Sequence, residues 1–340
     1  MQLLILTCQD DLHADAVIRL LSEREPAVEV IRVNTDNLPT NIDYSFQWAS
    51  CGETRSNTLR VRDANVAVTN ASVVWYRKPD RPPPHPALSD ENAQECSVLE
   101  YREFLRSFPG FFPQAIWVNE YWRMQRYSIK SNQIPVARSV GLDIPETLIT
   151  NDLDSIKKFA RRHDEIIVKP MAFSGFAVGR EQYACYTSAL NTSDVDRIDE
   201  RTLDYAPAIF QQRINKVQEL RVTVIGNEVF ACEIQTEPGM VENIDWRIKD
   251  VEDLPHILVD LPAEVCDRLR KMLFTMGLNF GAFDLIQDET GRYYFIEVNP
   301  NGQYYWIELL TGARLSAAMA DLIVRLSENP SGDGDRLKPL

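Results

Sequence analysis

The segment from Ala282 to Gly302 constrains the fold more than any other part of this chain. Two apolar runs enclose a polar turn at Asp288–Gly291, a pattern typical of a β-hairpin. Oxygen-bearing side chains interrupt the apolar runs at Asp284, Glu297 and Asn299. Because strand side chains alternate between faces, Glu297 and Asn299 point the same way. If the connecting loop holds an even number of residues, Asp284 shares that face, whereas an odd loop would place it on the other.

Two carboxylates and one amide oxygen on one face suit Mg²⁺, a hard cation that takes few protein ligands and leaves room for phosphates. The hairpin therefore predicts a metal site formed by Asp284, Glu297 and Asn299. The alternative is a solvent-exposed amphipathic hairpin with ordinary surface acids, since an acid followed two residues later by Asn is common. The hairpin alone leaves both interpretations open.

Composition excludes some classes of function. The net charge of −14 argues against bulk attraction to nucleic acid or to an anionic membrane. No apolar run approaches the roughly 18 residues that span a bilayer. The six cysteines are scattered without a C-x-x-C pair, which is typical of reduced thiols, so we expect a cytoplasmic protein.

A chain of 340 residues predicts two or three packed units. Residues 1–35 alternate strand, helix and strand, which indicates a βαβ unit in a mostly parallel sheet. The second unit should begin with a helix over 123–140 that Pro135 bends or ends. The expected divisions are an N-terminal α/β domain at 1–118, a central subdomain at 119–206, a C-terminal subdomain at 207–328, and a flexible tail at 329–340.

Two lysines are candidates for binding phosphate. Lys169 ends an apolar strand and precedes a loop containing Gly175 and Gly179, where an ammonium beside free backbone N–H groups suits phosphate oxygens. Lys130, on the preceding helix, supplies a second cation. The alternatives are a lysine exposed at a strand edge and a lysine on a solvated helix face.

The segment 208–214 passes from apolar into polar residues and is a candidate hinge between two sheets. A planar base between those sheets would hydrogen-bond to the exposed backbone and side-chain amides around Gln211, Gln212 and Ile214.

Glu219-Leu-Arg221 and Asp245-Trp-Arg247 each place an acid two residues from an arginine. Arg221 and Arg247 are candidates for clamping a phosphoryl group, because a guanidinium can bind it bidentately. The alternative is that each arginine pairs with its neighbouring acid or lies on the surface. A further basic cluster, Arg77 with Lys78 and Arg81, either holds an acidic peptide, completes a site between domains or only balances local charge.

Taken in chain order, these residues resemble the motifs of the ATP-grasp ligases, and among them the graspetide (microviridin-type) peptide maturases. The likeness covers residues 1 to 328. The quoted motifs are Lys130, Lys169, Gln211-Gln212, Glu219-Leu-Arg221, Asp245-Trp-Arg247, Asp284 and Glu297-Val-Asn299, with flanking text at 75–79, 117–119, 141–151, 299–303 and 306–308.

The resemblance implies an α+β chain: an ATP-grasp fold, in which two α/β subdomains grip ATP, preceded by an N-terminal α/β pre-ATP-grasp domain. It also implies roles for the candidate residues. Lys130 and Lys169 would contact the ATP phosphates, residues 211–214 would hold the adenine, and Glu219 would contact the nucleotide. Asp284, Glu297 and Asn299 would bind Mg²⁺, while Arg221 and Arg247 would steady the γ-phosphate and an acyl phosphate.

The function implied by the resemblance is that of an ADP-forming, macrocyclising ligase. It would activate Asp or Glu side chains of a ribosomal precursor peptide as acyl phosphates and condense them with Ser/Thr hydroxyls or Lys amines. The partner would carry a leader and a core rich in acids and hydroxyls; a homodimer is implied only by the same likeness. The alternatives are a ligase for free amino acids or glutamate addition, similar to glutathione synthetase, and a non-catalytic nucleotide-binding protein. The four histidines have no evident partner in the sequence, and we assign them no catalytic role.

Overall fold

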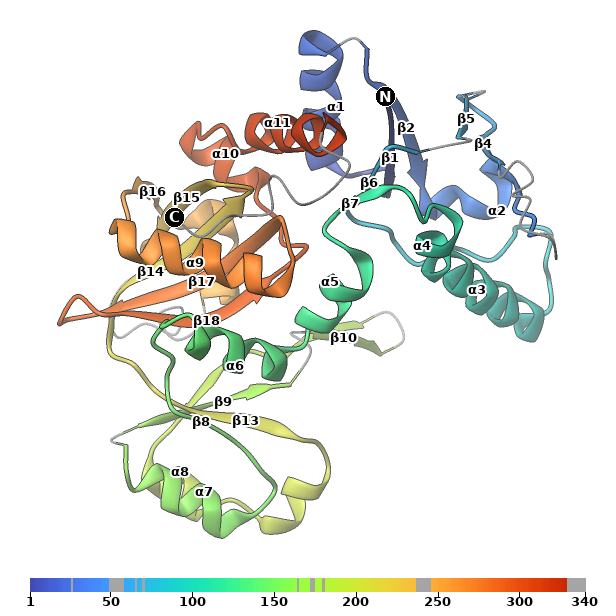
Figure 1. The fold of residues 1–340 in the computed structure, drawn as a ribbon. Coiled ribbons are helices and arrows are strands. Elements are labelled where there is room, and N and C mark those ends of the chain that lie inside the picture. Colours follow the sequence, from blue (N-terminus) through green and yellow to red (C-terminus); the bar gives the residue numbers. More distant parts are fainter. Residues whose placement is uncertain are drawn as a thin grey trace.

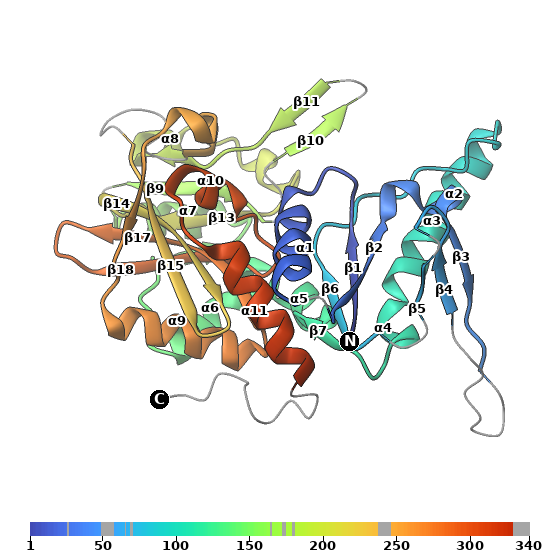
Figure 2. The same cartoon turned by 90° about the horizontal axis from the view of Figure 1, so that it is seen from above.

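The computed structural model describes residues 1–25, 27–48, 58–64, 66–68, 71–163, 165–171, 175–178, 181–236 and 246–328. They form an N-terminal domain followed by two further units of sheet and helix (Figure 1). Seen from above, the N-terminal domain lies to one side of the other two units (Figure 2). The tail expected at 329–340 lies outside the described residues.

The N-terminal domain is built on a parallel sheet with the order β2-β1-β6-β7. The strand–helix–strand pattern predicted for residues 1–35 is confirmed as β1, α1 and β2. Residues 3–7 of β1 are all buried, as expected of a parallel strand covered on both faces. The domain contains β1 (Gln2–Thr7), α1 (Leu12–Arg24), β2 (Glu29–Asn34), η1 (Thr35–Asn37), α2 (Leu38–Asn41), β3 (Ile42–Ser45), β4 (Thr58–Val61), β5 (Val66–Val68), β6 (Val73–Tyr76), α3 (Glu91–Arg106), α4 (Phe108–Phe111) and β7 (Ile116–Val118).

The helix predicted over 123–140 is two helices, α5 (Tyr121–Tyr127) and α6 (Lys130–Ser139). The interruption comes at Ser128, whose hydroxyl donates to the Met124 carbonyl at the end of α5. Pro135 lies inside α6, so of the two effects predicted for this proline, a bend or an end of the helix, the end at Pro135 was wrong. The break puts Lys130 in the first turn of α6, and α6 packs on β18 and α9 of the C-terminal unit.

The central unit is an antiparallel sheet with the order β12-β9-β13-β8. Apolar residues of α7 and α8 cover one of its faces (Figure 1). Because β13 completes this sheet, the chain leaves it after Gln212, a few residues beyond the expected division at 206/207. The glycine loop expected at 174–179 is in part the strand β10, and its residues Ser174 and Gly179 are outside the described part. The elements are β8 (Thr147–Ile149), α7 (Leu153–Ala160), β9 (Ile166–Pro170), β10 (Gly175–Val178), β11 (Glu181–Ala184), β12 (Ser188–Leu190), α8 (Thr192–Asp196), η2 (Glu200–Asp204) and β13 (Ala208–Gln212).

The C-terminal unit is an antiparallel sheet with the order β16-β15-β14-β17-β18. Gly312 adopts a left-handed φ of 75°, which ends α10 and separates it from α11, the last described helix. The elements are β14 (Lys216–Ile225), β15 (Glu228–Ile234), η4 (Trp246–Ile248), η5 (Val251–Asp253), β16 (His256–Val259), α9 (Ala263–Met276), β17 (Phe280–Asp288), β18 (Tyr293–Asn299), α10 (Tyr305–Thr311) and α11 (Leu315–Glu328).

One hydrophobic core joins the N-terminal domain to the C-terminal unit. Leu3 and Trp75 of the parallel sheet belong to the same buried cluster as Phe280 of β17 and Leu322 of α11. Helices α1 and α11 pack against each other at this junction (Figure 1). Because burial of shared apolar surface is the main stabilising term in folding, the two units are held together as one body. No helix in the described residues combines the length and apolarity needed to cross a bilayer.

Asn119 supplies buried polar contacts between the same two units. It is 1% exposed. Its Nδ2 donates to the carbonyls of Phe280 (2.9 Å) and Pro300 (2.5 Å), and its Oδ1 accepts from the backbone N–H groups of Asn279 (2.8 Å) and Phe280 (3.0 Å). One side chain at the end of β7 therefore satisfies four backbone groups of the C-terminal unit.

We predict that Asn119→Ala lowers the free energy of unfolding by about 2 kcal/mol or more, because it leaves buried backbone groups without partners. Urea denaturation measures this change. The matched control is Asn132→Ala, which removes one hydrogen bond to the Arg126 carbonyl in an exposed setting and should cost under about 0.5 kcal/mol. Equal losses in the two variants would contradict the role given to Asn119.

Candidate active site

A cleft lies between the central sheet and the C-terminal sheet. Its walls come from β9 and β13 on one side and from β14, β17 and β18 on the other, and the 213–215 segment joins the two sheets along it. Eight of the predicted site residues line this cleft: Lys130, Lys169, Gln211, Gln212, Ile214, Glu219, Asp284 and Glu297. Residues from six separate elements and the hinge are thus brought to one place.

Asp284 and Glu297 are direct partners across β17 and β18. Gln287 pairs with Tyr293, so an odd number of residues, five, lies between this pair, and the even loop assumed from the sequence is wrong. That register alone would send Asp284 to the opposite face. A β-bulge between Asp284 and Leu285 shifts the pairing by one residue and returns Asp284 to the face of Glu297.

The two carboxylates lie between two cations. Lys130 Nζ is 2.9 Å from Glu297 Oε2, and Arg221 Nη1 is 2.8 Å from Asp284 Oδ1. Arg221 is the direct partner of Asp284 on β14, so a row of charged side chains crosses three adjacent strands. Like charges placed directly opposite each other destabilise a sheet, and the flanking cations offset that repulsion.

Arg221 does not pair with its neighbouring acid. Its second contact, from Nη2, is with the Gln303 carbonyl at 3.3 Å, and Glu219 pairs with Lys216. The interpretation in which Arg221 and Glu219 form a local ion pair is therefore wrong. Arg221 instead links the carboxylate row to the loop that follows β18.

Lys169 is buried, with 7% of its surface exposed. Strand β9 lies between β12 and β13, so the alternative of a lysine at an exposed strand edge is wrong. Its Nζ donates to Gln211 Oε1 at 3.0 Å, and Gln211 Nε2 donates to Thr147 Oγ1 at 2.8 Å. Because burial of an ammonium is costly, the polar partners and the cleft-facing position are both needed to keep it charged.

The hinge residues meet the cleft as predicted. The Gln212 side-chain oxygen accepts from the Glu146 backbone N–H at 3.3 Å, which ties β13 to the segment before β8. Ile214 lies on the connection between the sheets and also lines the cleft. Apolar residues on both sides, Ile167 from the central sheet and Ile286 from the C-terminal sheet, complete a slot suited to a planar ring.

Two predicted residues are placed differently. Asn299 is exposed, and its Oδ1 accepts from the Asn301 backbone N–H at 2.9 Å; it does not line the cleft. Arg247 lies in η4, one residue after Trp246, which does line the cleft, but its side chain is outside the described part, as is all of Asp245.

Sequence reasoning missed the apolar walls and Trp246. Ile286 follows Asp284 by two residues on the same strand, so the period of two could have identified it. Ile296 lines the cleft because the bulge displaces it, and no local signal indicates that. Trp246 reaches the cleft through a long connection, in contact with Trp306 of α10 at a ring-centroid distance of 6.0 Å.

Comparison with known proteins agrees with this architecture. Residues 2–125 match the family model of the MvdD pre-ATP grasp domain, and residues 137–300 match the ATP-grasp domain of prokaryotic glutathione synthetase. Among curated protein sequences, none matches the chain significantly.

Solved structures share the fold over nearly the whole chain. A RiPP-associated ATP-grasp ligase from Chryseobacterium gregarium, in complex with ADP and a leader and core peptide, is 26% identical with a TM-score of 0.85, covering 100% of this chain and 99% of that one. The macrocyclase MdnC from Microcystis aeruginosa, bound to its precursor peptide MdnA, is 26% identical with a TM-score of 0.81, covering 96% and 100%. The ligase PsnB, complexed with a precursor variant, Mg and ADP, is 20% identical with a TM-score of 0.73, covering 96% and 98%.

The chain therefore combines a pre-ATP-grasp domain with an ATP-grasp domain that follows it, and the predicted fold class is confirmed. Its neighbours include RiPP-associated ligases and macrocyclases, which agrees with the resemblance to graspetide maturases found in the sequence.

Gly302 lies in the loop after β18, at the point where this loop packs closely against Ala282 and Arg221. A Cβ there would be 2.5 Å from the Ala282 Cβ and 2.8 Å from Arg221 Nη2. We predict that Gly302→Ala lowers the free energy of unfolding by about 1–3 kcal/mol, since the loop or Arg221 must move. Thermal or urea unfolding measures it. Gly110→Ala is the control: a Cβ at Gly110 in α4 meets nothing within 4 Å and should be neutral or slightly stabilising. An unchanged Gly302→Ala protein would show that the loop is not tightly packed.

Proposed function

We propose that this protein is an ATP-dependent macrocyclising ligase acting on a ribosomal precursor peptide. It activates Asp or Glu side-chain carboxylates as acyl phosphates and condenses them with Ser/Thr hydroxyls or Lys amines. The observation that carries the proposal is the charged row of Lys130, Glu297, Asp284 and Arg221 at a cleft that also contains the buried Lys169. Such a row is suited to a triphosphate and its counter-ion.

Magnesium fits the residues present. In the described part of the chain no group of three or more His, Cys, Asp or Glu side chains forms a metal cage. Two opposed carboxylates, with Asn299 two residues beyond Glu297, leave most coordination positions to phosphate oxygens and water, which is the usual arrangement for Mg²⁺. When bound, the ion would neutralise phosphate charge. Asp284 and Glu297 would hold it, and Asn299 would join them only by turning away from Asn301.

The remaining residues would position the nucleotide. Gln211, Gln212 and Ile214 at the hinge would hold the adenine, with Ile167 and Ile286 above and below the ring. Glu219, on the same cleft, would contact the nucleotide. Lys130 and Lys169 would contact the phosphates, so Lys130 would exchange its present partner Glu297 for a phosphate oxygen.

The chemistry needs charge neutralisation and alignment more than a protein nucleophile. A substrate carboxylate oxygen attacks the γ-phosphorus and ADP leaves, which gives an acyl phosphate. A hydroxyl or amine then attacks the acyl carbon, phosphate leaves, and the proton of the attacking group is released. Arg221 and Arg247 would steady the transferring group, as a guanidinium binds phosphate bidentately.

The two halves of the chain match different families and therefore favour different substrates. The ATP-grasp half matches the glutathione synthetase model, which favours the alternative of a ligase for free amino acids or glutamate addition. The N-terminal half matches the MvdD pre-ATP grasp domain, and full-length neighbours at 26% identity were solved with peptides bound. Because the whole chain, and not only its nucleotide-binding half, agrees with the peptide ligases, a precursor peptide is the favoured substrate.

We predict that Glu297→Gln lowers ATP turnover by more than about 100-fold while the fold is retained, since one carboxylate of the metal pair loses its charge. ADP release measures turnover and circular dichroism checks the fold. Glu289→Gln, which removes an exposed acid from the turn of the same hairpin, is the control and should turn over normally. Normal turnover in Glu297→Gln would remove Glu297 from the site, and no turnover in the wild type would favour a non-catalytic nucleotide-binding protein.

A second prediction concerns the product. With ATP and a peptide whose leader is followed by a core rich in Asp/Glu and Ser/Thr/Lys, mass spectrometry should show a loss of about 18 Da per link, as one water is removed in each condensation. ADP formation with free amino acids and no peptide would instead support the small-molecule ligase.

A further inference from the structure

The loop from Asn299 to Tyr305, which follows the metal-binding strand β18, is held from the N-terminal domain. Asn119 Nδ2 donates to the Pro300 carbonyl at 2.5 Å, and Arg77 Nη1 donates to the Asn301 carbonyl at 3.3 Å. His13 Nε2 accepts from the backbone N–H groups of Tyr304 and Tyr305, each at 3.0 Å. Three side chains far away in sequence thus hold the backbone of one short loop.

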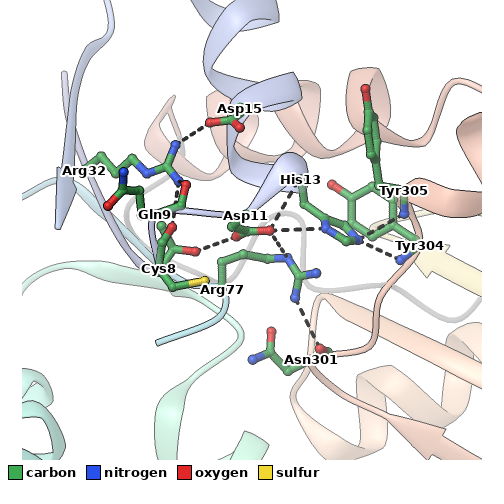
Figure 3. Close-up of polar contacts among 11 residues, drawn as sticks. Cys8, Gln9, Asp11, His13, Asp15, Arg32, Arg77, Asn301, Tyr304 and Tyr305 are labelled. Atoms are coloured by element: carbon green, nitrogen blue, oxygen red, sulfur yellow. Dashed lines mark hydrogen bonds and ion pairs between the residues drawn. The ribbon is translucent and has the colours of Figure 1, made fainter. Parts of the chain in front are cut away.

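His13 acts as a helix cap supplied by another domain. The first backbone N–H groups of a helix have no partner within it. In α10, the side chain of the N-cap residue makes no capping hydrogen bond, and the imidazole of His13 takes its place from 291 residues away (Figure 3). The Tyr304 ring also lies edge-on to the imidazole, with centroids 4.7 Å apart.

The hydrogen bonds fix the protonation state of His13. Because Nε2 accepts twice, the ring proton is on Nδ1, which lies 3.2 Å from Asp11 Oδ1 (Figure 3). Asp11 is 1% exposed and is held in turn by the Thr7 hydroxyl at 2.5 Å. A neutral imidazole oriented by a buried carboxylate is a rigid acceptor, since its tautomer and ring plane are both set.

Arg77 is buried in the same place. It is 2% exposed, and its Nε is 3.9 Å from Asp11 Oδ1. Among the described residues, Nε and Nη2 have no hydrogen-bond partner. Of the basic cluster seen in the sequence, Arg77 thus lies between domains, while Arg81 is exposed and pairs with Glu95. Burying a guanidinium whose hydrogen bonds are incomplete costs folding free energy. A functional role for its contact with the loop would explain why the arginine is kept there.

The loop leads directly to the charged row. Arg221 donates from Nη2 to the Gln303 carbonyl and from Nη1 to Asp284. Gly302 leaves no room for even a methyl group between the loop and Arg221. Movement of the loop is therefore passed on to Arg221, and through it to Asp284.

We propose that His13 and Arg77 are positioning residues for the metal-binding carboxylates: they hold the Asn299–Tyr305 loop in the position that aligns Arg221, Asp284 and Glu297. This inference rests on the proposed function, because it assumes that those carboxylates bind a metal–nucleotide complex. The N-terminal domain would then contribute to nucleotide binding without touching the nucleotide.

The test compares binding of ADP with and without Mg²⁺ by calorimetry. His13→Ala should weaken Mg·ADP binding by about 10- to 100-fold, as loss of a group that orients a metal ligand commonly does. Binding of ADP in EDTA should change less than about threefold. His13→Gln should restore Mg·ADP affinity to within about threefold of the wild type, because its amide oxygen can accept from the loop while its NH₂ group donates to Asp11.

Two matched controls come from the same domain. His85→Gln replaces a histidine whose Nδ1 accepts only a local backbone N–H, from Ala87, and should bind Mg·ADP as the wild type does. Arg77→Met should weaken Mg·ADP binding, whereas Arg81→Met should not. Unchanged Mg·ADP affinity in His13→Ala and Arg77→Met, or an equal loss with and without Mg²⁺, would overturn the inference. A wild-type protein that binds no Mg·ADP would instead overturn the proposed function.

A measurement on the wild type keeps the inference testable if His13→Ala does not fold. Binding energies of two coupled sites are reciprocal, so Mg·ADP should slow hydrogen exchange of the Tyr304 and Tyr305 amides that His13 holds. ADP in EDTA should not slow it. Exchange at these amides that is unaffected by Mg·ADP would overturn the inference.

The same geometry has a pH signature. Burial lowers the pKa of His13 to about 4, against an opposing effect of Asp11, and the nearby cations Arg77 and Lys78 lower it further. Burial alone would raise the pKa of Asp11, but its hydrogen bond with His13, the Arg77 charge and the Thr7 hydrogen bond bring it to about 2. The unfolded chain therefore binds more protons at His13 between about pH 6.5 and pH 4, and wild-type stability should fall as pH drops through that window. His13→Gln should show a smaller fall, since burial also lowers the pKa of His256 and that contribution remains; an identical pH profile would overturn the neutral-cap assignment.

Discussion

The pairing of Asp284 with Glu297 across two adjacent strands is the constraint on which the rest of this structure depends. Two carboxylates directly opposite each other repel, and positive charge beside them offsets the repulsion. Here β14, the neighbour of β17, carries Arg221, and α6 packs against β18 and brings Lys130 to Glu297. Lys130 and Arg221 neutralise the two carboxylates. With a divalent ion and a triphosphate bound, the carboxylates would pair with the ion and the cations with phosphate oxygens.

The central sheet forms the opposite wall of the cleft and carries a buried charge of its own. Lys169 is buried in the middle of that sheet and donates a hydrogen bond to Gln211, whose side chain donates in turn to Thr147. These three residues come from β9, β13 and β8, so the sheet itself presents the ammonium to the cleft. The short connection from β13 to β14 joins the two walls, so Lys169 on the central sheet faces the same cleft as Asp284 and Glu297 on the C-terminal sheet.

Sequence patterns predicted the hairpin and eight of the polar and hinge residues that line the cleft, but not the way in which the strands meet. The hairpin at β17 and β18 and the shared face of Asp284 and Glu297 followed from alternation, yet the loop is odd and a bulge restores the face. Phe283 and Phe295 of the two strands are both buried in the core of the C-terminal unit, so contacts beyond the hairpin bear on its register. Local pattern also could not tell that Lys169 lies in the middle of a sheet, because strand order is set by contacts distant in sequence.

His13 shows the same limit more sharply. The sequence showed no evident partner for this histidine, although Asp11 stands only two residues away. The role of the pair depends on the amides of Tyr304 and Tyr305 at the other end of the chain. The N-terminal domain matches a pre-ATP-grasp model and holds none of the cleft-lining residues, so it would read as a separate module. Its buried contacts with Pro300, Asn301 and the start of α10 argue otherwise. A cleft whose carboxylates must be held to a fraction of an ångström needs rigid support behind them, and in this chain part of that support is supplied by the first 119 residues.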